Sequence, residues 1–226
     1  MRISILGASG KVGKALVALV NQTPGTELAE AISNTGRDGT VSLADADLEN
    51  CDVVIDFSTP AGVMALLDQL AGSALPLVIG TTGFSEEQAA RIEAEANNRP
   101  ILVGANFTKG FESFAAAALS LANTFPDASV TVGEIYNINK KASPSGTTQR
   151  LLLELGENGR KIETDIGRVG DTPGVNSVEI DYGVARLRVE LTVRSRDAYA
   201  AGSLDAALWI IEQPNGYYQP KDMISA

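Results

Sequence analysis

The chain has 226 residues, of which 44% are hydrophobic and 20% are charged, and its net charge is −10. This length suffices for one large domain or two small ones. The acidic balance argues against a nucleic-acid partner, because a phosphate backbone is bound by clustered Lys and Arg. A single cysteine, Cys51, excludes an internal disulfide, and the lack of histidine removes the commonest general acid–base and metal ligand.

The sequence also predicts where the protein is found. No apolar run is long enough to span a membrane, and Met1 leads directly into the first expected strand without a signal peptide. One cysteine fits a reducing compartment. We therefore expect a cytoplasmic protein with no membrane partner.

A glycine-rich turn between a strand and a helix opens the chain. Arg2–Leu6 is typical of a buried parallel strand, and the residues after the turn have the apolar pattern of a helix. Gly7, Gly10 and Gly13 have the spacing of a dinucleotide site. Gly7 permits a tight turn, Gly10 lets N–H groups approach a pyrophosphate, and Gly13 permits close helix–strand packing. A turn without a ligand is the alternative, and the position between strand and helix argues against it.

The end of the second expected strand predicts the cofactor. Glu27–Ile32 is that strand, and in a dinucleotide fold the adenosine ribose lies where it ends. An acidic residue there would bind the 2′-hydroxyl of NAD. Ser33, Asn34 and Arg37 stand there instead, and they suit a 2′-phosphate better. The sequence therefore favours NADPH over NADH, with an ordinary surface turn as the alternative.

Strands and helices continue to alternate up to residue 107. The expected elements are strand Val53–Phe57, a helix ending at Leu70, strand Leu77–Ile79, helix Ser85–Asn97 capped by Ser85 and Gln88, and strand Ile101–Val103. This alternation predicts an α/β, doubly wound parallel sheet. Glycine-rich and polar loops follow the strands at their carboxyl ends, where such sheets bind ligands.

The character of the sequence changes after Phe107. The expected elements are helix Phe111–Phe125, strand Ser129–Tyr136, a helix from about Thr147 to Leu155, strands Val178–Asp181 and Ala185–Val193, and helix Leu204–Ile211. Alternation in the last strand predicts one buried and one solvated face. We expect a second, α+β domain with a mostly antiparallel sheet, used for substrate binding or assembly. The C-terminal helix is expected to return to the first domain.

Five motifs, taken in order, resemble the 4-hydroxy-tetrahydrodipicolinate reductase family, also called dihydrodipicolinate reductase. They are G-A-S-G-K-V-G at 7–13, D-F-S-T-P at 56–60, I-G-T-T-G-F at 79–84, A-N-F at 105–107 and K-K-A-S-P-S-G-T-T at 140–148. The resemblance implies a Rossmann-like dinucleotide-binding domain over residues 1–106, completed by about 203–226. It implies a substrate-binding and oligomerisation domain over 107–202, in a homotetramer.

The resemblance also implies an activity and a cofactor site. The family transfers a hydride from NADH or NADPH to a small anionic cyclic imine or enamine in lysine and diaminopimelate biosynthesis. The implied cofactor contacts are Gly7, Ala8, Ser9, Gly10, Lys11, Val12, Gly13, Ser33, Asn34, Arg37, Phe57, Ser58, Gly80, Thr81, Thr82, Gly104, Ala105, Asn106 and Phe107.

A substrate site follows from the same resemblance. The catalytic lysine of the family falls on Lys140, and its substrate-carboxylate cradle falls on Ser145, Gly146 and Thr147. The cradle also makes physical sense: Pro144 would fix a turn, Gly146 would open the backbone, and Thr147 would cap a helix. The N-terminus of that helix could then accept a carboxylate.

Two positions before the lysine depart from the family pattern. Tyr136 stands where the family has its proton-donating histidine, and Asn137 where it has a substrate-binding one. Further histidines of the family pattern are missing near Asn176 and Leu191. Lys140 and Tyr136 are then the candidate proton donors, the latter if a nearby lysine lowers its pKa. Asn137 can bind a carboxylate or carbonyl by hydrogen bonds but cannot titrate.

Three functions remain open at this point. A reductase of 4-hydroxy-tetrahydrodipicolinate is favoured. A reductase of the same family that acts on another cyclic imine would explain the missing histidines, and so would a non-catalytic relative that binds a nucleotide. The retained Lys140 and P-S-G-T-T at 144–148 argue against the non-catalytic relative.

Overall fold

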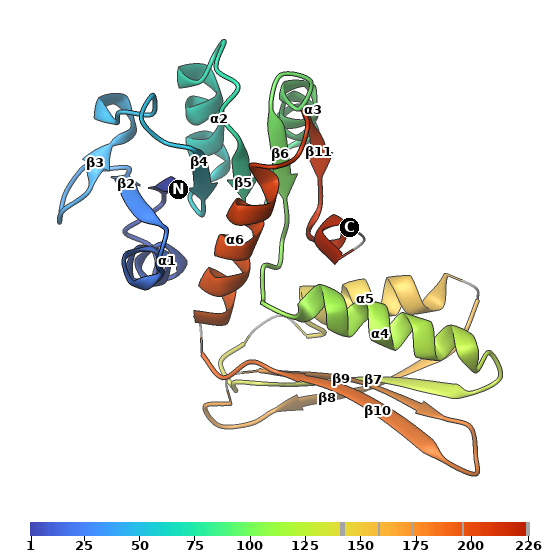
Figure 1. Cartoon of the computed structure of the whole chain (residues 1–226). Helices are drawn as coiled ribbons and strands as arrows, with labels where there is room; N and C mark the ends of the chain where they lie inside the picture. The colour runs from blue at the N-terminus through green and yellow to red at the C-terminus, as the bar shows by residue number, and fades with distance from the viewer. Residues whose placement is uncertain (141–142, 158, 173, 196, 225–226) are drawn as a thin grey trace. The chain divides into compact units, whose positions relative to one another are not determined.

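The structure is a computed structural model that describes residues 1–140, 143–157, 159–172, 174–195 and 197–224. The chain divides into two compact units (Figure 1). Unit 1 contains Met1–Lys109 and Arg196–Ala226, and unit 2 contains Gly110–Ser195. Among the described residues, no helix has the length and apolar character needed to cross a bilayer.

Unit 1 is built on a parallel sheet with the strand order β3-β2-β1-β4-β5-β6-β11. Its strands are β1 (Arg2–Leu6), β2 (Glu27–Ser33), β3 (Val41–Ser42), β4 (Val53–Asp56), β5 (Leu77–Ile79), β6 (Pro100–Val103) and β11 (Gly216–Tyr218). The order changes direction between β1 and β4. In doubly wound sheets the ligand crevice lies at this point, beyond the carboxyl ends of the strands.

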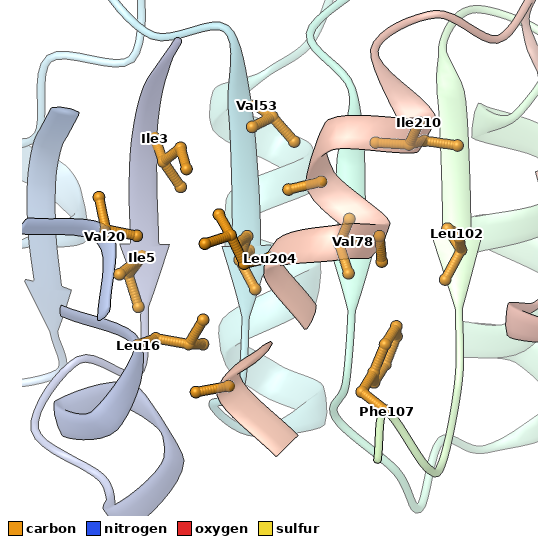
Figure 2. Close-up of a cluster of buried hydrophobic side chains, with 14 of the residues drawn as sticks. Ile3, Ile5, Leu16, Val20, Val53, Val78, Leu102, Phe107, Leu204 and Ile210 are labelled. Carbon is orange, nitrogen blue, oxygen red and sulfur yellow. The ribbon is translucent and has the colours of Figure 1, made fainter. Parts of the chain in front are cut away.

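Helices cover both faces of this sheet, as the alternating pattern predicts. They are α1 (Lys11–Gln22) and α6 (Asp197–Ile210) on one face, and α2 (Pro60–Gln69) and α3 (Glu86–Glu95) on the other. Figure 2 shows the core beneath α1 and α6, where side chains of both helices lie over β1, β4, β5 and β6. The labelled residues there are Leu16, Val20, Leu204, Ile210, Ile3, Ile5, Val53, Val78, Leu102 and Phe107.

Local signals define the starts of two helices. Before α3, the Ser85 hydroxyl accepts a hydrogen bond from the Gln88 N–H (3.2 Å), and the Gln88 side chain accepts one from the Ser85 N–H (3.0 Å). The predicted capping box is therefore confirmed. Before α2, the Thr59 hydroxyl accepts from the Gly62 N–H (3.1 Å), with Pro60 at the first helical position.

Unit 2 has a mixed sheet with the strand order β10-β9-β7-β8. The strands are β7 (Ser129–Tyr136), β8 (Ile162–Arg168), β9 (Val175–Asp181) and β10 (Arg186–Thr192). β9 pairs antiparallel with β7 and β10, whereas β8 pairs parallel with β7. Helices α4 (Phe111–Thr124) and α5 (Gly146–Gly156) lie on one face (Figure 1). The predicted second, mostly antiparallel sheet is thus confirmed.

The structure adds elements that the sequence pattern did not predict. The strand β8 is an edge strand without a buried residue, and it has no apolar run. The strands β3 and β11, and the short 3₁₀ helices η1 (Leu43–Asp45) and η2 (Pro220–Ile224), are too short for a periodic signal. Helix α6 begins at Asp197, earlier than the expected Leu204; its first half consists mostly of small residues, which give no apolar periodicity. Glycine is required at position 202, because a Cβ there would lie 1.8 Å from the Phe107 carbonyl oxygen.

Candidate functional site

A cleft of about 800 Å³ lies at the carboxyl ends of β1, β2 and β4 in unit 1. The predicted cofactor residues that line it are Gly7, Ser9, Gly10, Ser33, Asn34, Phe57 and Ser58. The sheet therefore brings together loops that are far apart in the sequence, at the edge where the fold class binds ligands.

The glycine turn lines part of this cleft. Gly7 has φ +87°, and a Cβ there would lie 2.3 Å from the Phe57 carbonyl oxygen. A Cβ at Gly13 would lie 2.2 Å from the Gly7 carbonyl oxygen, so Gly13 packs against the turn itself. No side chain caps α1, and its first turn has no acidic residue. The helix start therefore presents N–H donors and a partial positive charge, which suits a phosphate.

Ser33 holds the loop at the end of β2. Its buried hydroxyl shares a hydrogen bond with the Thr40 hydroxyl (2.6 Å) and accepts one from the Gly36 N–H (3.1 Å). Asn34 is exposed and lines the cleft, and Arg37 is exposed in the same loop. Asn34 and Arg37 therefore offer exposed polar groups at this end, whereas the hydroxyl of Ser33 shapes the loop.

Asp56 is a buried carboxyl group at the end of β4, with 1% of its surface exposed. Its Oδ1 accepts hydrogen bonds from the Ser58 N–H (3.0 Å) and hydroxyl. The same N–H also donates to the Thr81 hydroxyl (3.0 Å), which joins the loop after β4 to the loop after β5. Oδ2 is buried without a hydrogen bond of good geometry in the described part of the chain. Burial raises the pKa of Asp56 more than its hydrogen bonds to Ser58 and Thr81 lower it.

Two glycines and two aromatic rings support these loops. The rings of Phe57 and Phe107 meet edge to face with centroids 5.9 Å apart. A Cβ at Gly80 would lie 2.3 Å from the Phe57 ring, and a Cβ at Gly104 would lie 2.5 Å from the Pro220 side chain. The ring of Phe107 belongs to the core (Figure 2). Glycine is therefore required at the ends of β5 and β6.

The remaining residues predicted to bind the cofactor lie in the same loops. Ala8 is buried in the glycine turn, Lys11 and Val12 are in the first turn of α1, Thr82 follows β5, and Ala105 and Asn106 follow β6. The Asn106 side chain accepts a hydrogen bond from the Thr108 N–H (2.9 Å), which orders the loop after β6.

Glu134 lies at the centre of a hydrogen-bond network in unit 2. It is on β7 with 1% of its surface exposed. Its carboxylate accepts hydrogen bonds from the Ser145 N–H (3.0 and 3.2 Å), the Thr148 hydroxyl and Arg168 Nη2 (2.7 Å). Burial raises the pKa of Glu134, but the hydrogen bonds from Ser145, Thr148 and Arg168 outweigh it and hold the pKa below its usual value. The charged carboxylate therefore joins the start of α5 to β8.

Lys140 lies beside the ring of Tyr136 in the same unit. Its Nζ is 3.7 Å from the ring centroid, within the range of a cation–π contact. Tyr136 is buried, and its hydroxyl donates to Asn176 Oδ1 (2.8 Å). Burial lowers the pKa of Lys140, Glu134 raises it and Arg168 lowers it again, so that the pKa lies below its usual value. The structure thus brings the two candidate proton donors together.

Asn137 is paired within its own loop. Its Nδ2 donates to Asp171 Oδ1 (2.6 Å), and its Oδ1 accepts from the Asn139 N–H (2.8 Å). The side chain predicted to bind the substrate therefore has an acidic partner in this structure.

The start of α5 differs from the prediction in its cap. Ser145, not Thr147, is the N-cap: its hydroxyl accepts from the Thr148 N–H (3.3 Å), and the helix begins at Gly146. The expectation that Thr147 caps the helix is wrong, because the helix starts earlier than predicted. A Cβ at Gly146 would meet nothing within 4 Å, so the packing of the chain does not require glycine there. Glycine leaves the backbone at this helix start open to a ligand.

Sequence reasoning missed four members of these networks. Asp56 and Glu134 could have been found, because each is a carboxylate among the apolar residues of a predicted strand. Arg168 and Asn176 gave no such signal. They reach the site through β8, which was not predicted, and through the pairing of β9 with β7.

Comparisons with known proteins cover both units. The family model described as "Dihydrodipicolinate reductase, N-terminus" matches residues 1–107, and "Dihydrodipicolinate reductase, C-terminus" matches residues 110–224. The chain is 30% identical to the 4-hydroxy-tetrahydrodipicolinate reductase of Methylocella silvestris, over 99% of this chain and 97% of that protein. It is 31% identical to the enzyme of that name from Halorhodospira halophila, over 98% of each.

A solved structure has the same fold. It is the dipicolinate-bound dihydrodipicolinate reductase from Paenisporosarcina, with a TM-score of 0.82 and 20% sequence identity. The match covers 97% of each chain.

Proposed function

The chain belongs to the dihydrodipicolinate reductase family, and on this premise we propose that it reduces 4-hydroxy-tetrahydrodipicolinate with NADPH or NADH. This reaction belongs to lysine and diaminopimelate biosynthesis. The observation that carries the proposal is the match of both family models in order. The chain has a glycine-turn cleft in unit 1, and in unit 2 Lys140 comes shortly before α5 in the sequence.

The test is direct turnover. The oxidation of NADPH and of NADH is followed by absorbance with enzymatically generated 4-hydroxy-tetrahydrodipicolinate, and the product is identified by mass. We expect turnover that depends on both substrate and cofactor. Cofactor binding without turnover would contradict the substrate assignment, and a lack of cofactor binding would contradict the assignment of the cleft.

The cleft of unit 1 supports the cofactor assignment. Neither Gly7 nor Gly13 can carry a Cβ, and the uncapped start of α1 offers backbone donors to a pyrophosphate. When bound, a reduced nicotinamide supplies the hydride. The loops after β4, β5 and β6, held by Asp56, Gly80 and Gly104, are the proposed support for the rest of the cofactor.

The network of unit 2 supports a substrate site for an anion. The start of α5 offers a helix N-terminus with no acidic residue in its first turn, and Gly146 leaves the backbone open. We propose that Ser145, Gly146 and Thr147 bind a substrate carboxylate there. Lys140 supplies positive charge near the reacting atoms and is a source for the proton that the reduced substrate requires.

We also propose a preference for NADPH. The residues that follow β2 include Asn34 and Arg37 and no carboxylate at positions 33–37, which favours a 2′-phosphate over a free 2′-hydroxyl. Arg37→Ala is expected to raise KM for NADPH and to leave KM for NADH unchanged. Lys14→Ala, on the exposed side of α1, is the matched control. An unchanged ratio of the two KM values would contradict this preference.

The exposed face of the unit 2 sheet supports a homo-oligomer, which we propose is a tetramer in the cytoplasm. In the described part of the chain, α4 and α5 cover only the opposite face. The exposed face carries Arg186 and Arg188, which pair with Glu179 (3.3 and 3.9 Å). Light scattering is expected to give about four times the chain mass of 23.6 kDa. A monomeric mass would contradict the assembly, and cell fractionation tests the compartment.

A different cyclic imine is the second candidate substrate. Asn137 is paired with Asp171, and the neighbouring side chains of Ile138 and Val169 are 65% and 56% exposed. A carboxylate and two apolar side chains favour a substrate with fewer carboxylates. Turnover of a panel of cyclic imines with one or two carboxylates distinguishes the two candidates: a monocarboxylate turned over in preference to 4-hydroxy-tetrahydrodipicolinate would support the second.

A further inference from the structure

The ring and the hydroxyl of Tyr136 make different contacts: the ring contacts Lys140, and the hydroxyl donates to Asn176. The ring faces Lys140 Nζ, which is 3.7 Å from the centroid, and the guanidinium of Arg168 is 5.9 Å from the same centroid. The face of an aromatic ring attracts a cation. Within residues 1–140 and the other described ranges, the Lys140 ammonium group contacts this ring and has no hydrogen-bond acceptor, so its protons are available to another molecule.

The hydroxyl of Tyr136 is fixed from the other side. It donates to Asn176 Oδ1 (2.8 Å), and Asn176 has 2% of its surface exposed. The Asn176 Nδ2 donates to the Thr148 hydroxyl (3.4 Å), which donates to Glu134. A buried hydrogen-bond chain therefore connects the phenol to the buried carboxylate. The proton of the phenol is directed into this chain, away from the ring face where Lys140 lies.

The backbone also restricts the ring. A Cβ at Gly174 would lie 2.7 Å from Tyr136 Cε1, so the ring edge lies directly against the backbone at that position. The ring is thus held at its edge by Gly174 and at its hydroxyl by Asn176. Its orientation under Lys140 is determined by the fold and does not depend on a ligand.

We propose, on the premise of the function proposed above, that Tyr136 is a positioning residue that acts through its ring: the ring holds the Lys140 ammonium group, and Lys140 Nζ donates the proton. The phenol keeps its proton throughout. The hydride brings an electron pair to the substrate and forms a C–H bond. The substrate C=N or C=C π bond breaks as this C–H bond forms, and a bound reduced nicotinamide would be oxidised as it supplies the hydride. One proton passes from Lys140 Nζ to the resulting anion, and the neutral amine of Lys140 regains a proton from water, which leaves hydroxide to the solvent.

The charges around Lys140 suit this role. Burial has the largest effect and lowers the pKa of Lys140, the charge of Glu134 raises it, and the charge of Arg168 lowers it. The pKa of Lys140 lies below its usual value as a result, which makes the ammonium a stronger acid. The ring supplies attraction without a negative charge, so it holds the cation without forming an ion pair that would compete for the proton.

The experiment compares two substitutions of one residue. Tyr136→Phe retains the ring and removes the hydroxyl, whereas Tyr136→Leu removes the ring. We expect kcat of Tyr136→Leu to be about 3- to 30-fold lower than kcat of Tyr136→Phe, which is the range of a cation–π contact. The alkaline limb of the pH profile of kcat/KM, where the Lys140 ammonium is lost, is expected to stay in place in Tyr136→Phe and to move in Tyr136→Leu.

A second measurement does not need activity. The ε-methylene protons of Lys140 lie over an aromatic ring, so their NMR signal is expected upfield of the other lysines in the wild type and in Tyr136→Phe. The upfield position is expected to be lost in Tyr136→Leu, and Lys140→Met assigns the signal. Circular dichroism identifies any variant that fails to fold, and the wild-type spectrum then still tests the contact.

The outcomes separate this inference from the proposed function. Equal loss of kcat in Tyr136→Phe and Tyr136→Leu, with loss of the alkaline limb in Tyr136→Phe, would make the phenol the acid and overturn the inference. An unshifted Lys140 signal in the wild type would overturn the contact. A wild type that shows the shifted signal but no turnover would overturn the proposed function while supporting the contact between Lys140 and Tyr136.

Discussion

Each unit buries one carboxyl group beside its candidate site, and the two have pKa shifts of opposite direction. Asp56 in unit 1 has a pKa above its usual value, because burial is the dominant effect and Oδ2 lacks a hydrogen bond of good geometry among the described residues. Glu134 in unit 2 has a pKa below its usual value, because Ser145, Thr148 and Arg168 donate to it. Burial alone therefore does not set the protonation state; the number and charge of the donors do.

The difference follows from what each unit uses to build its site. Unit 1 positions its cleft with backbone: glycines, helix starts and strand ends, with the Ser58 N–H joining two loops through Asp56 and Thr81. Unit 2 positions its site with side chains, and Glu134 is the acceptor that joins α5 to β8. In unit 1 burial of Asp56 outweighs its donors and raises its pKa, whereas in unit 2 a network of donors that includes Arg168 favours the charged form of Glu134.

The largest effect is expected for Lys140→Met, which tests whether the chemistry belongs to unit 2 alone. Loss of the proton donor is expected to lower kcat by about 10²- to 10⁴-fold. The affinity for NADPH, measured by fluorescence titration, is expected to stay unchanged because the glycine turn is intact. Lys161→Met, at an exposed lysine of unit 2, is the matched control. If Lys140→Met lowered the affinity for NADPH as much as it lowers kcat, the cofactor site and the site of Lys140 would not be separable.

The next effect concerns Glu134. Glu134→Ala is expected to lower the free energy of unfolding by about 3–5 kcal/mol, because it breaks a buried ion pair and removes the shared acceptor of Ser145, Thr148 and Arg168. Glu163→Ala, at an exposed position of the adjacent strand β8, is the control and is expected to change it by about 0.5 kcal/mol or less. Urea unfolding followed by circular dichroism measures both. Similar losses in the two variants would contradict the central role of the network.

The pH dependence of Glu134 follows from its lowered pKa. Its contribution to stability is fully present above the pKa of an unfolded glutamate, about 4.3, and is lost as the pH falls through the lower folded value. Wild-type stability is therefore expected to fall on acidification more steeply than that of Glu134→Gln.

A smaller effect is expected at the glycine turn. Gly7→Ala places a Cβ at positive φ and against the Phe57 carbonyl, which is expected to lower the free energy of unfolding by about 1–3 kcal/mol and to weaken NADPH binding. Gly25→Ala is the matched control: Gly25 has φ +84° but open space around its Cβ position, so only about 1–2 kcal/mol of backbone strain is expected, with no change in binding. Equal affinity for NADPH in Gly7→Ala and Gly25→Ala would contradict the role of the glycine turn in cofactor binding.

The smallest effect is expected for Asp56→Asn, and it has the opposite pH dependence to Glu134. Because the folded pKa is raised, wild-type stability falls as the pH rises from the unfolded to the folded pKa, by about 1.4 kcal/mol for each unit that separates them. Asn cannot ionise, so the variant is expected to lack this fall. Urea unfolding curves across the acidic pH range measure this fall. The same pH dependence of stability in the wild type and in Asp56→Asn would contradict a raised pKa of Asp56.

Local patterns carried most of the information about unit 1. The strands β1, β4, β5 and β6 are short apolar runs buried on both faces. The start of α3 is marked by a capping box, Ser85 with Gln88, that spans only four residues. Such signals depend on neighbours in the chain, so a single sequence is enough to interpret them. The strands β3 and β11 were not predicted, because a strand of two or three residues has no periodic pattern.

By itself, the sequence determined the doubly wound sheet, the glycine turn at Gly7 and Gly13, and the position of Lys140 before a helix. Only the tertiary structure decided what surrounds that lysine. The Tyr136 ring, Asn176 and Arg168 come from three different strands, and their contacts span up to 40 residues of chain. Contacts of this range depend on strand register and on the packing of α5. The backbone of the site could therefore be predicted from local chemistry, whereas the hydrogen-bond partners around Lys140 could not.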